Sequence, residues 1–368
     1  EQRLADAEVL WAEVGEMVMQ PLAKAVAGVD TLVISPDGEL NRLPFAALPA
    51  PGAEGLLTER YQLRLVTTGR ELLDLKESLQ SRGKTPLVVA NPDFDLLLGE
   101  SRRSPGPAIV SLTAQQKEVE SAFAERSQQR SSETDQLVWG PLPGTKKEGE
   151  FVSGLLNGRL LVEENARAET VQQAKAPMVL HIASHAFFLP DQENESQEGS
   201  GDDVMRAGLQ GDRGLKASDL ADESPLLRSG IALAGANRVS QREEGEEGDD
   251  GYLTALEVAQ LDWKGTELVV ISACESGKGD IRSGEGVYGL KRAIAVSGAR
   301  SSLLSLWKVD DRATAAFMRS YYEKLKAGQG RADALAITQK EFRNHRIPMW
   351  RHPNIWAAFQ LSGDWRPI

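Results

Sequence analysis

Short apolar runs alternate along the chain with longer segments in which apolar residues recur every three to four positions. The short runs predict β-strands and the longer periodic segments predict α-helices. Strands are predicted at 30–40, 61–68, 85–95, 177–188, 229–236, 266–274 and 301–307. Helices are predicted at 4–26, 69–80, 113–126, 254–261, 284–298 and 311–328. This alternation is typical of α/β proteins with a largely parallel central sheet.

Three of the predicted strands, near residues 180, 270 and 304, are nearly continuous apolar runs. Strands that helices cover on both faces show this pattern, because every side chain along them is buried. We therefore expect these three strands at the centre of the sheet. In open parallel sheets, catalytic groups gather beyond the carboxyl ends of the strands. The residues that follow these runs are the first candidates for chemistry.

The only cysteine of the chain, Cys274, follows one of these runs in the sequence ELVVISACESGKGD. A lone cysteine is often a small buried hydrophobic residue. The alternative is that Cys274 is a catalytic nucleophile. Such a thiol needs a nearby base, because only the thiolate is strongly nucleophilic. Of the four histidines, His185 lies at the end of the apolar run near residue 180, whereas His181 lies inside it. His185 is the candidate base, and we expect His181 in the core.

The acidic charge of the chain is concentrated in one region. Of the net charge of −12, −10 falls between residues 191 and 250, where there are 16 Asp and Glu and 6 Lys and Arg. Segments 191–203 and 241–251 are typical of solvated loops, and neither has the alternating ligand spacing of a calcium loop. We expect no metal and no cofactor, with a calcium site in these carboxylate clusters as the alternative.

Composition also restricts which binding partners and which cellular compartment we expect. The sequence contains no basic stripe, so nucleic acid is not an expected ligand. It contains no apolar run long enough to span a membrane, and its first residues lack the pattern of a signal peptide. A single cysteine fits a reducing compartment, so we expect a cytoplasmic protein.

A series of motifs in a fixed order resembles the CHAT domain family. The motifs are LVISPDGELNRLPFAAL, TTGRELL, LPGTKKEGE, VLHIASHAFF, RSGIALAGAN, GYLTALEVAQLD, ELVVISACESGKGD, GEGVYGLKRAIAVSGARSSLLSLWKVDDRAT and HPNIWAAFQLSGDW. CHAT domains are caspase-like domains, related to separase, that are usually attached to tetratricopeptide repeats. The resemblance implies a caspase-like α/β/α sandwich over residues 83–368, preceded by a smaller N-terminal CHAT subdomain over residues 1–82.

The resemblance also implies a cysteine endopeptidase with Cys274 as the nucleophile and His185 as the general base and then acid. The backbone N–H groups of Cys274 and Ala186 would form the oxyanion hole. The family usually has glycine in place of Ala186, an exchange that keeps the N–H donor but narrows the backbone conformations available. The sequence offers no evident third catalytic residue, which leaves a backbone carbonyl as a candidate to orient the imidazole.

Substrate preference is implied by a shorter likeness. LWKVDDR, residues 306–312, resembles the LW-x-V-x-D-R segment of separase, whose acidic residue faces an arginine of the substrate. By position this residue is Asp311, with Asp310 beside it, and the expected cleavage is after Arg or Lys. The alternative is that Asp311 caps the following helix. The segment 277–286 is either a flexible active-site loop or a site of self-processing at Lys278 or Arg282.

The expected partners follow from the same resemblance. They are a protein or peptide substrate and a regulatory protein partner or attached tetratricopeptide repeats, with no nucleic acid and no membrane. The alternative function is a catalytically weak or inactive caspase-like interaction module, in which the fold transmits signals through the repeats.

Overall fold

The computed structural model of the chain describes residues 2–52, 54–76, 83–96, 137–188, 226, 229–241, 249–272, 274–275 and 285–368. Its largest element is an eight-stranded sheet. The strands are β1 (Thr31–Ile34), β2 (Gln62–Leu65), β3 (Leu87–Pro92), β4 (Arg159–Glu163), β5 (Val179–Ala183), β9 (Leu268–Ile271), β11 (Ser301–Ser305) and β12 (Phe359–Gly363). A smaller sheet contains β6 (His185–Phe188), β7 (Ser229–Ala232), β8 (Tyr252–Thr254) and β10 (Cys274–Glu275).

The large sheet is mostly parallel. Its strand order is β1-β2-β12-β11-β9-β5-β3-β4, and of the neighbouring pairs β11 and β12 alone are antiparallel. The strands β1, β2 and β12 therefore run opposite to the others. An α/β fold with a largely parallel central sheet is thus confirmed, and β5, β9 and β11 lie in the middle of it as expected.

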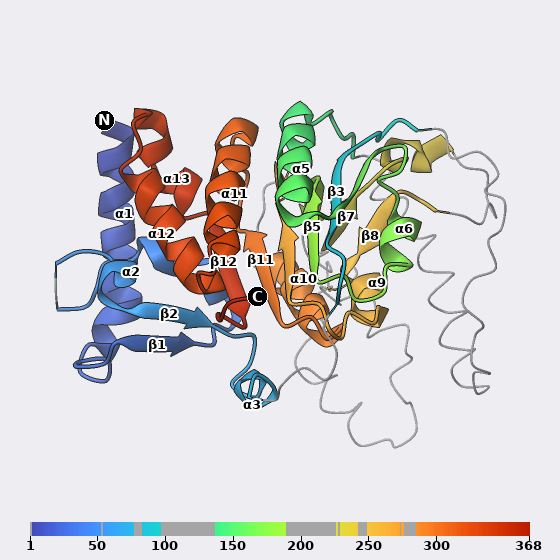
Figure 1. The fold of residues 1–368 in the computed structure, drawn as a ribbon. Coiled ribbons are helices and arrows are strands. Elements are labelled where there is room, and N and C mark those ends of the chain that lie inside the picture. Colours follow the sequence, from blue (N-terminus) through green and yellow to red (C-terminus); the bar gives the residue numbers. More distant parts are fainter. Residues whose placement is uncertain are drawn as a thin grey trace, which may run out of the picture.

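Helices cover both faces of this sheet (Figure 1). They are α1 (Gln2–Met19), α2 (Leu57–Arg60), α3 (Glu71–Asp74), α5 (Pro143–Leu156), α6 (Ala168–Gln172), α9 (Ala255–Gln260), α10 (Glu285–Val296), α11 (Asp311–Lys326), α12 (Arg331–Arg343) and α13 (Pro353–Trp356). Short 3-10 turns are η1 (Gln20–Leu22), η2 (Gly38–Arg42), η3 (Phe45–Ala47), η5 (Ala236–Gln241) and η6 (Pro348–Arg351). One core packs against α5, α11 and α12, and the other against α6, α9 and α10.

Successive residues of the central strands enter these two different cores. On β3, Val88 packs with α5, α11 and α12, whereas Val89 packs on the opposite side. On β9, Val270 and Val269 divide in the same way, and all four side chains are fully buried. The continuous apolar runs of the sequence arise because both faces of each strand are covered.

Two predicted strands divide where the sheets meet. The strand signal over 177–188 covers two strands: β5 ends at Ala183, in agreement with the end of the apolar run near Ser184, and β6 begins at His185 in the smaller sheet, which the sequence did not predict. Between them, the Ser184 hydroxyl donates a hydrogen bond to the Ala232 carbonyl of β7, which anchors the chain as it leaves the large sheet. The predicted strand over 266–274 divides likewise into β9 and β10. Both central strands therefore change sheets at their carboxyl ends.

Some predicted helices are shorter than the pattern indicated. The helix expected over 4–26 ends as α1 at Met19, and Pro21 lies in the turn η1 that follows, since proline lacks the N–H that a continuing helix needs. The helix expected over 69–80 is observed as α3 alone, and residues 77–80 lie outside the described part. The predicted helix over 113–126 also lies outside it.

The N-terminal strands extend the large sheet. β1 and β2 pair with each other, and β2 meets β12 at one position, where Leu65 is aligned with Ser362. This region has its own apolar cluster around Leu48 and Leu57, both fully buried. The division into 1–82 and 83–368 stays a prediction.

Helix α5 offers a matched test of close packing between a helix and the sheet. A Cβ added to Gly149 would lie 2.6 Å from the Ala90 Cβ of β3, whereas a Cβ on Gly154 of the same helix would meet nothing within 4 Å. We expect Gly149→Ala to lower the free energy of unfolding by about 1–3 kcal/mol. Gly154→Ala should raise it by about 0.5–1 kcal/mol, because alanine favours the helix. Urea denaturation measures both, and equal effects of the two exchanges would contradict this account of α5.

Candidate active site

His185 begins β6 and its imidazole is almost completely buried, with 4% of the residue exposed. Its Nε2 atom lies 2.8 Å from the backbone carbonyl oxygen of Gly140. Two aromatic rings flank the imidazole, with centroids 5.2 Å away at Phe94 and 5.3 Å away at Trp139. These contacts fix both the position and the tilt of the ring.

The segments that carry these neighbours are joined by Asn237 of η5. Its side-chain oxygen accepts a hydrogen bond from Trp139 N at 2.8 Å, and its amide nitrogen donates to Trp139 O at 3.0 Å. Its backbone N–H donates to Phe94 O at 2.9 Å. The Trp139 indole N–H donates in turn to the Tyr252 hydroxyl at 2.9 Å. The rings of Phe94 and Trp139 that flank His185 are therefore held in place by this hydrogen-bond network.

The Gly140 contact selects one tautomer of His185. A carbonyl oxygen can only accept a hydrogen bond, so the Nε2 atom 2.8 Å away carries the proton. In the neutral imidazole the lone pair then lies on Nδ1, which is the atom that can accept a proton. A backbone carbonyl, Gly140 O, thus orients the imidazole, which is the arrangement that the sequence had left open.

Cys274 begins β10, whose backbone pairs in parallel with β6. The register aligns Cys274 with His185 and Glu275 with Ala186. Aligned positions on neighbouring strands lie about 4.8 Å apart. The fold therefore brings together the two residues that the sequence selected, although they are far apart in the chain.

Ala186 follows His185 within β6 and is buried, with 3% exposed. Its φ angle is not among the positive values recorded for non-glycine residues of the described chain. It adopts the extended conformation of a strand, which alanine takes as readily as other residues. The exchange of glycine for alanine therefore costs this position no backbone strain.

The two acidic candidates have different surroundings at the start of α11. Asp310 is the helix cap, since its side chain accepts hydrogen bonds from Arg312 N at 3.1 Å and Ala313 N at 3.0 Å. The capping role considered for Asp311 therefore belongs to its neighbour. Asp311 packs against Gly144, where an added Cβ would lie 2.8 Å from the Asp311 Cβ. Because Gly144 closely follows Gly140, Asp311 lies near the segment that orients His185.

His181 lies inside β5, as expected, and is fully buried. Its Nδ1 atom lies 3.1 Å from the Tyr322 hydroxyl, and its Nε2 atom lies 3.0 Å from the carboxylate of the buried Glu148. Burial raises the pKa of Tyr322 well above its usual value. This cluster joins β5 to α5 and α11 within the core.

Several sequence-based candidates lie outside the described residues. They include the segment 276–284, with Lys278 and Arg282, the acidic segment 191–203, and residues 242–248 of the second acidic segment. Within the described ranges, no group of three or more His, Cys, Asp or Glu side chains is arranged to hold a metal ion. The helices of those ranges include none with the length and apolarity to cross a membrane.

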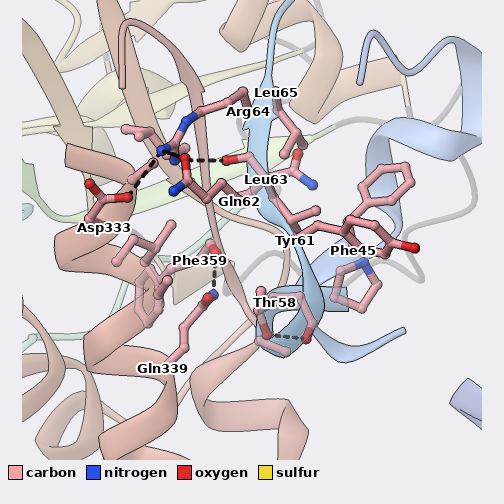
Figure 2. Close-up of a pocket in the computed structure, with 18 residues that line it drawn as sticks. Phe45, Thr58, Tyr61, Gln62, Leu63, Arg64, Leu65, Asp333, Gln339 and Phe359 are labelled. Atoms are coloured by element: carbon pink, nitrogen blue, oxygen red, sulfur yellow. Dashed lines mark hydrogen bonds and ion pairs between the residues drawn. The ribbon is translucent and has the colours of Figure 1, made fainter. Parts of the chain in front are cut away.

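A separate cavity of about 120 Å³ lies beside the single contact between β2 and β12 (Figure 2). In it the Arg64 guanidinium binds Asp333 at 3.1 Å and the Gln62 side-chain oxygen at 2.9 Å. Gln339 donates a hydrogen bond to Phe359 O at 3.1 Å. These polar groups bind one another, and the lining contains no cysteine or histidine. The sequence did not single out this region, and we assign it no chemistry.

The fold and the site define an α/β protein whose one cysteine is aligned, on paired strands, with a buried and oriented histidine beyond adjacent strand ends. Residues 9–364 match the CHAT domain. The chain belongs to the CHAT domain family, and the resemblance drawn from its motifs is confirmed over nearly the whole length.

Curated relatives include tetratricopeptide repeat protein 28 of Homo sapiens and of Mus musculus. Each is 25% identical over 334 residues, which cover 90% of this chain and 12% of the relative. The chain therefore spans only a small part of these relatives. Among solved structures, two crystal structures of the Saccharomyces cerevisiae separase–securin complex are similar to this chain. They have a TM-score of 0.39, 12% and 13% identity, and cover 88% of this chain and 15% of the other.

The structure also supplies residues that sequence reasoning missed. Gly140, Phe94, Trp139 and Asn237 surround or support His185. Phe94 lies in the predicted strand 85–95 and Asn237 ends the motif RSGIALAGAN, but nothing in the sequence assigned either of them a role at the site, and Gly140 and Trp139 lie outside the motifs. Their contacts with the site cross 45 to 98 positions of sequence. The motif LPGTKKEGE begins two residues after Gly140.

Proposed function

We propose that the chain is a cysteine endopeptidase in which Cys274 is the nucleophile and His185 the general base. One observation carries the proposal: the parallel pairing of β10 with β6 aligns these two residues at neighbouring positions. With backbones about 4.8 Å apart, side chains at aligned positions can come within the hydrogen-bond reach that proton transfer from a thiol to an imidazole requires. Membership of the CHAT domain family supports the same assignment.

The contacts of the His185 imidazole support its role as a base. The hydrogen bond to Gly140 O keeps the proton on Nε2, so Nδ1 takes the proton from the Cys274 thiol. Phe94 and Trp139 limit the motion of the ring. A base held in its working orientation loses little entropy on the way to the transition state.

The reaction then follows acyl transfer. The Cys274 thiolate adds to the carbon of the scissile carbonyl, and the backbone N–H groups of Cys274 and Ala186 donate hydrogen bonds to the oxyanion. The imidazolium of His185 returns its proton to the leaving amine as the C–N bond breaks. A water molecule, deprotonated by His185, hydrolyses the thioester and releases the thiol.

Cleavage after Arg or Lys is the second part of the proposal. Asp311 lies near the segment that orients His185, where a carboxylate favours a basic side chain through charge-assisted hydrogen bonds. Asp310 supports this arrangement by capping α11 and fixing where Asp311 stands. Peptides with Arg at the cleavage position are the substrate class that fits this carboxylate.

Asp311→Asn tests this specificity against Asp310→Asn. We expect Asp311→Asn to lower kcat/KM by about a hundredfold for substrates with Arg at the cleavage position, because one charge-assisted contact is lost. Asp310→Asn should change kcat/KM little, since asparagine caps a helix as well as aspartate does. Fluorogenic peptides that differ only at that residue measure both. A loss that is the same for Arg and for a neutral residue would refute the specificity.

An interaction module is the second candidate function. It is favoured by one observation: the curated relatives are named as tetratricopeptide repeat proteins, and this chain matches 12% of their length. In that role the domain would pass signals to attached repeats or a regulatory partner without cleaving anything. Turnover of fluorogenic Arg peptides by the purified chain decides between the two functions: turnover supports the peptidase, and its absence with all tested peptides supports the module.

A further inference from the structure

Four basic side chains line a groove of about 440 Å³ at the edge of the large sheet where its parallel strands begin. Lys264 precedes β9, Lys175 precedes β5, Lys84 precedes β3, and Arg159 is the first residue of β4. These four strands are consecutive in the sheet, so the groove carries one cation for each strand. With strands about 4.8 Å apart, the row of cations spans about 14 Å.

Within the described part of the chain, no carboxylate forms an ion pair with this row, although the Asp262 carboxylate accepts a hydrogen bond from the backbone N–H of Lys264 at 3.2 Å. All four side chains are exposed, and within the described part of the chain none of them takes part in an ion pair or a side-chain hydrogen bond. The groove lining includes no Asp or Glu. In a chain with a net charge of −12, this concentration of unpaired positive charge is a local exception. Its field attracts anions to this edge.

The backbone under the cations is held tightly together. Gly83 N donates a hydrogen bond to Gly265 O at 2.9 Å, which ties the residue before Lys84 to the residue after Lys264. A Cβ on Gly83 would lie 2.1 Å from Ala176 O, the residue after Lys175. The backbone that carries the four cations is therefore already ordered. Little conformational entropy of this backbone is lost when a ligand binds.

We propose that this groove binds an acidic peptide segment of a partner protein. An extended chain advances about 3.3–3.6 Å per residue, so four or five residues cross the row of about 14 Å and present carboxylates to it. The four cations match such a segment in charge and in length. The groove lining contains no aromatic side chain to stack on a base, and the net charge of −12 opposes a long polyanion, so a nucleic acid fits less well.

The groove lies on the opposite edge of the sheet from the candidate active site. Cys274 and His185 follow the carboxyl ends of β9 and β5, whereas Lys264 and Lys175 precede their amino ends. A strand of five residues separates the two edges by about 16 Å. A peptide bound in the groove leaves the candidate active site open. The proposal does not depend on the peptidase function, and binding is measured without turnover.

Fluorescence anisotropy of a labelled hexaglutamate peptide with the full chain at low ionic strength tests the proposal. We expect saturable binding that added salt weakens, and no binding of the matching hexaglutamine peptide. The double exchange of Lys84→Glu and Lys175→Glu should weaken binding by about tenfold or more, because attraction becomes repulsion at two positions. The matched control exchanges Lys24→Glu and Lys326→Glu, which are exposed elsewhere, and should leave the affinity nearly unchanged.

Circular dichroism confirms that each variant is folded, and the single variant Arg159→Gln provides a milder test if the double variant is not. The proposal is wrong if hexaglutamate fails to bind or if hexaglutamine binds equally well. It is also wrong if both double variants weaken binding alike. Tighter binding of a labelled hexathymidylate than of hexaglutamate would make the groove a nucleic-acid site and overturn the assignment to a peptide.

Discussion

Cys274→Ala is expected to lower kcat/KM for Arg peptides by about 10⁴-fold or more. Alanine cannot form the thioester on which the proposed reaction depends. His185→Ala should cause a loss of similar size, because the thiol then has no base beside it. The double variant should be no slower than either single variant, since the two residues act as one unit. Fluorogenic turnover at a fixed pH measures all three.

His345→Ala is the matched control for the loss of an imidazole. His345 follows α12 and packs against Phe342 and Trp350, away from β6 and β10. We expect its removal to leave kcat/KM within about twofold of the original. Turnover that persists in Cys274→Ala would remove the thiol from the mechanism and with it the proposed function.

Arg331→Met is expected to lower the free energy of unfolding by about 3–5 kcal/mol, the largest loss of stability that we predict for a single exchange. Arg331 is fully buried, and its guanidinium binds the carboxylate of the equally buried Glu267 and the backbone carbonyl of Asp364. Methionine keeps much of the shape but leaves these acceptors without their positive partner. Burial alone would raise the pKa of Asp364, yet hydrogen bonds from Arg366 and Arg300 and the charge of Arg331 hold that pKa well below its usual range.

Arg366→Met is the control for this network. Arg366 binds the same Asp364 carboxylate at 2.7 Å, but its side chain is 49% exposed. Water can hydrate the Asp364 carboxylate in place of Arg366, so we expect the free energy of unfolding to change by less than about 1 kcal/mol. Adding Glu267→Gln to Arg331→Met should recover part of the stability, because the buried negative charge is removed as well. Equal losses for Arg331→Met and Arg366→Met in urea denaturation would contradict this account.

The central strands could be predicted from the sequence because their burial leaves a continuous signal. Val269 and Val270 face opposite cores, and each is fully buried. Both therefore had to be apolar, and the run identified a central strand. The position of Cys274 beyond such a strand followed from the same signal. The position of His185 at the end of an apolar run singled it out among four histidines, and the family motifs then supported that choice.

The division of the strands could not be predicted in this way. The apolar run ends near Ser184, but the residues on both sides favour strands, so the pattern did not show that a second strand begins at His185. What ends β5 is a tertiary contact: the Ser184 hydroxyl binds the Ala232 carbonyl, 48 positions away. The hydrophobic pattern reports local burial and carries no information on which distant strand takes up the chain.

The residues that hold the candidate base His185 in place could not be predicted from the sequence either. The Gly140 carbonyl that orients His185 belongs to the backbone, which every residue has, so no side-chain type marks it. Asn237 joins the flanking segments through contacts that span 98 positions to Trp139. Sequence reasoning selected the candidate pair Cys274 and His185, and only the fold shows what holds the imidazole in place.

The rate at which an arginine chloromethyl ketone peptide alkylates Cys274, followed by mass spectrometry, tests the dyad most directly. It needs no knowledge of the natural substrate, because the reagent requires only a reactive thiolate beside a site that accepts arginine. We predict selective labelling of Cys274 that is slowed by at least about a hundredfold in His185→Ala and is unchanged in His345→Ala. Labelling of Cys274 at the same rate with and without His185 would contradict the account.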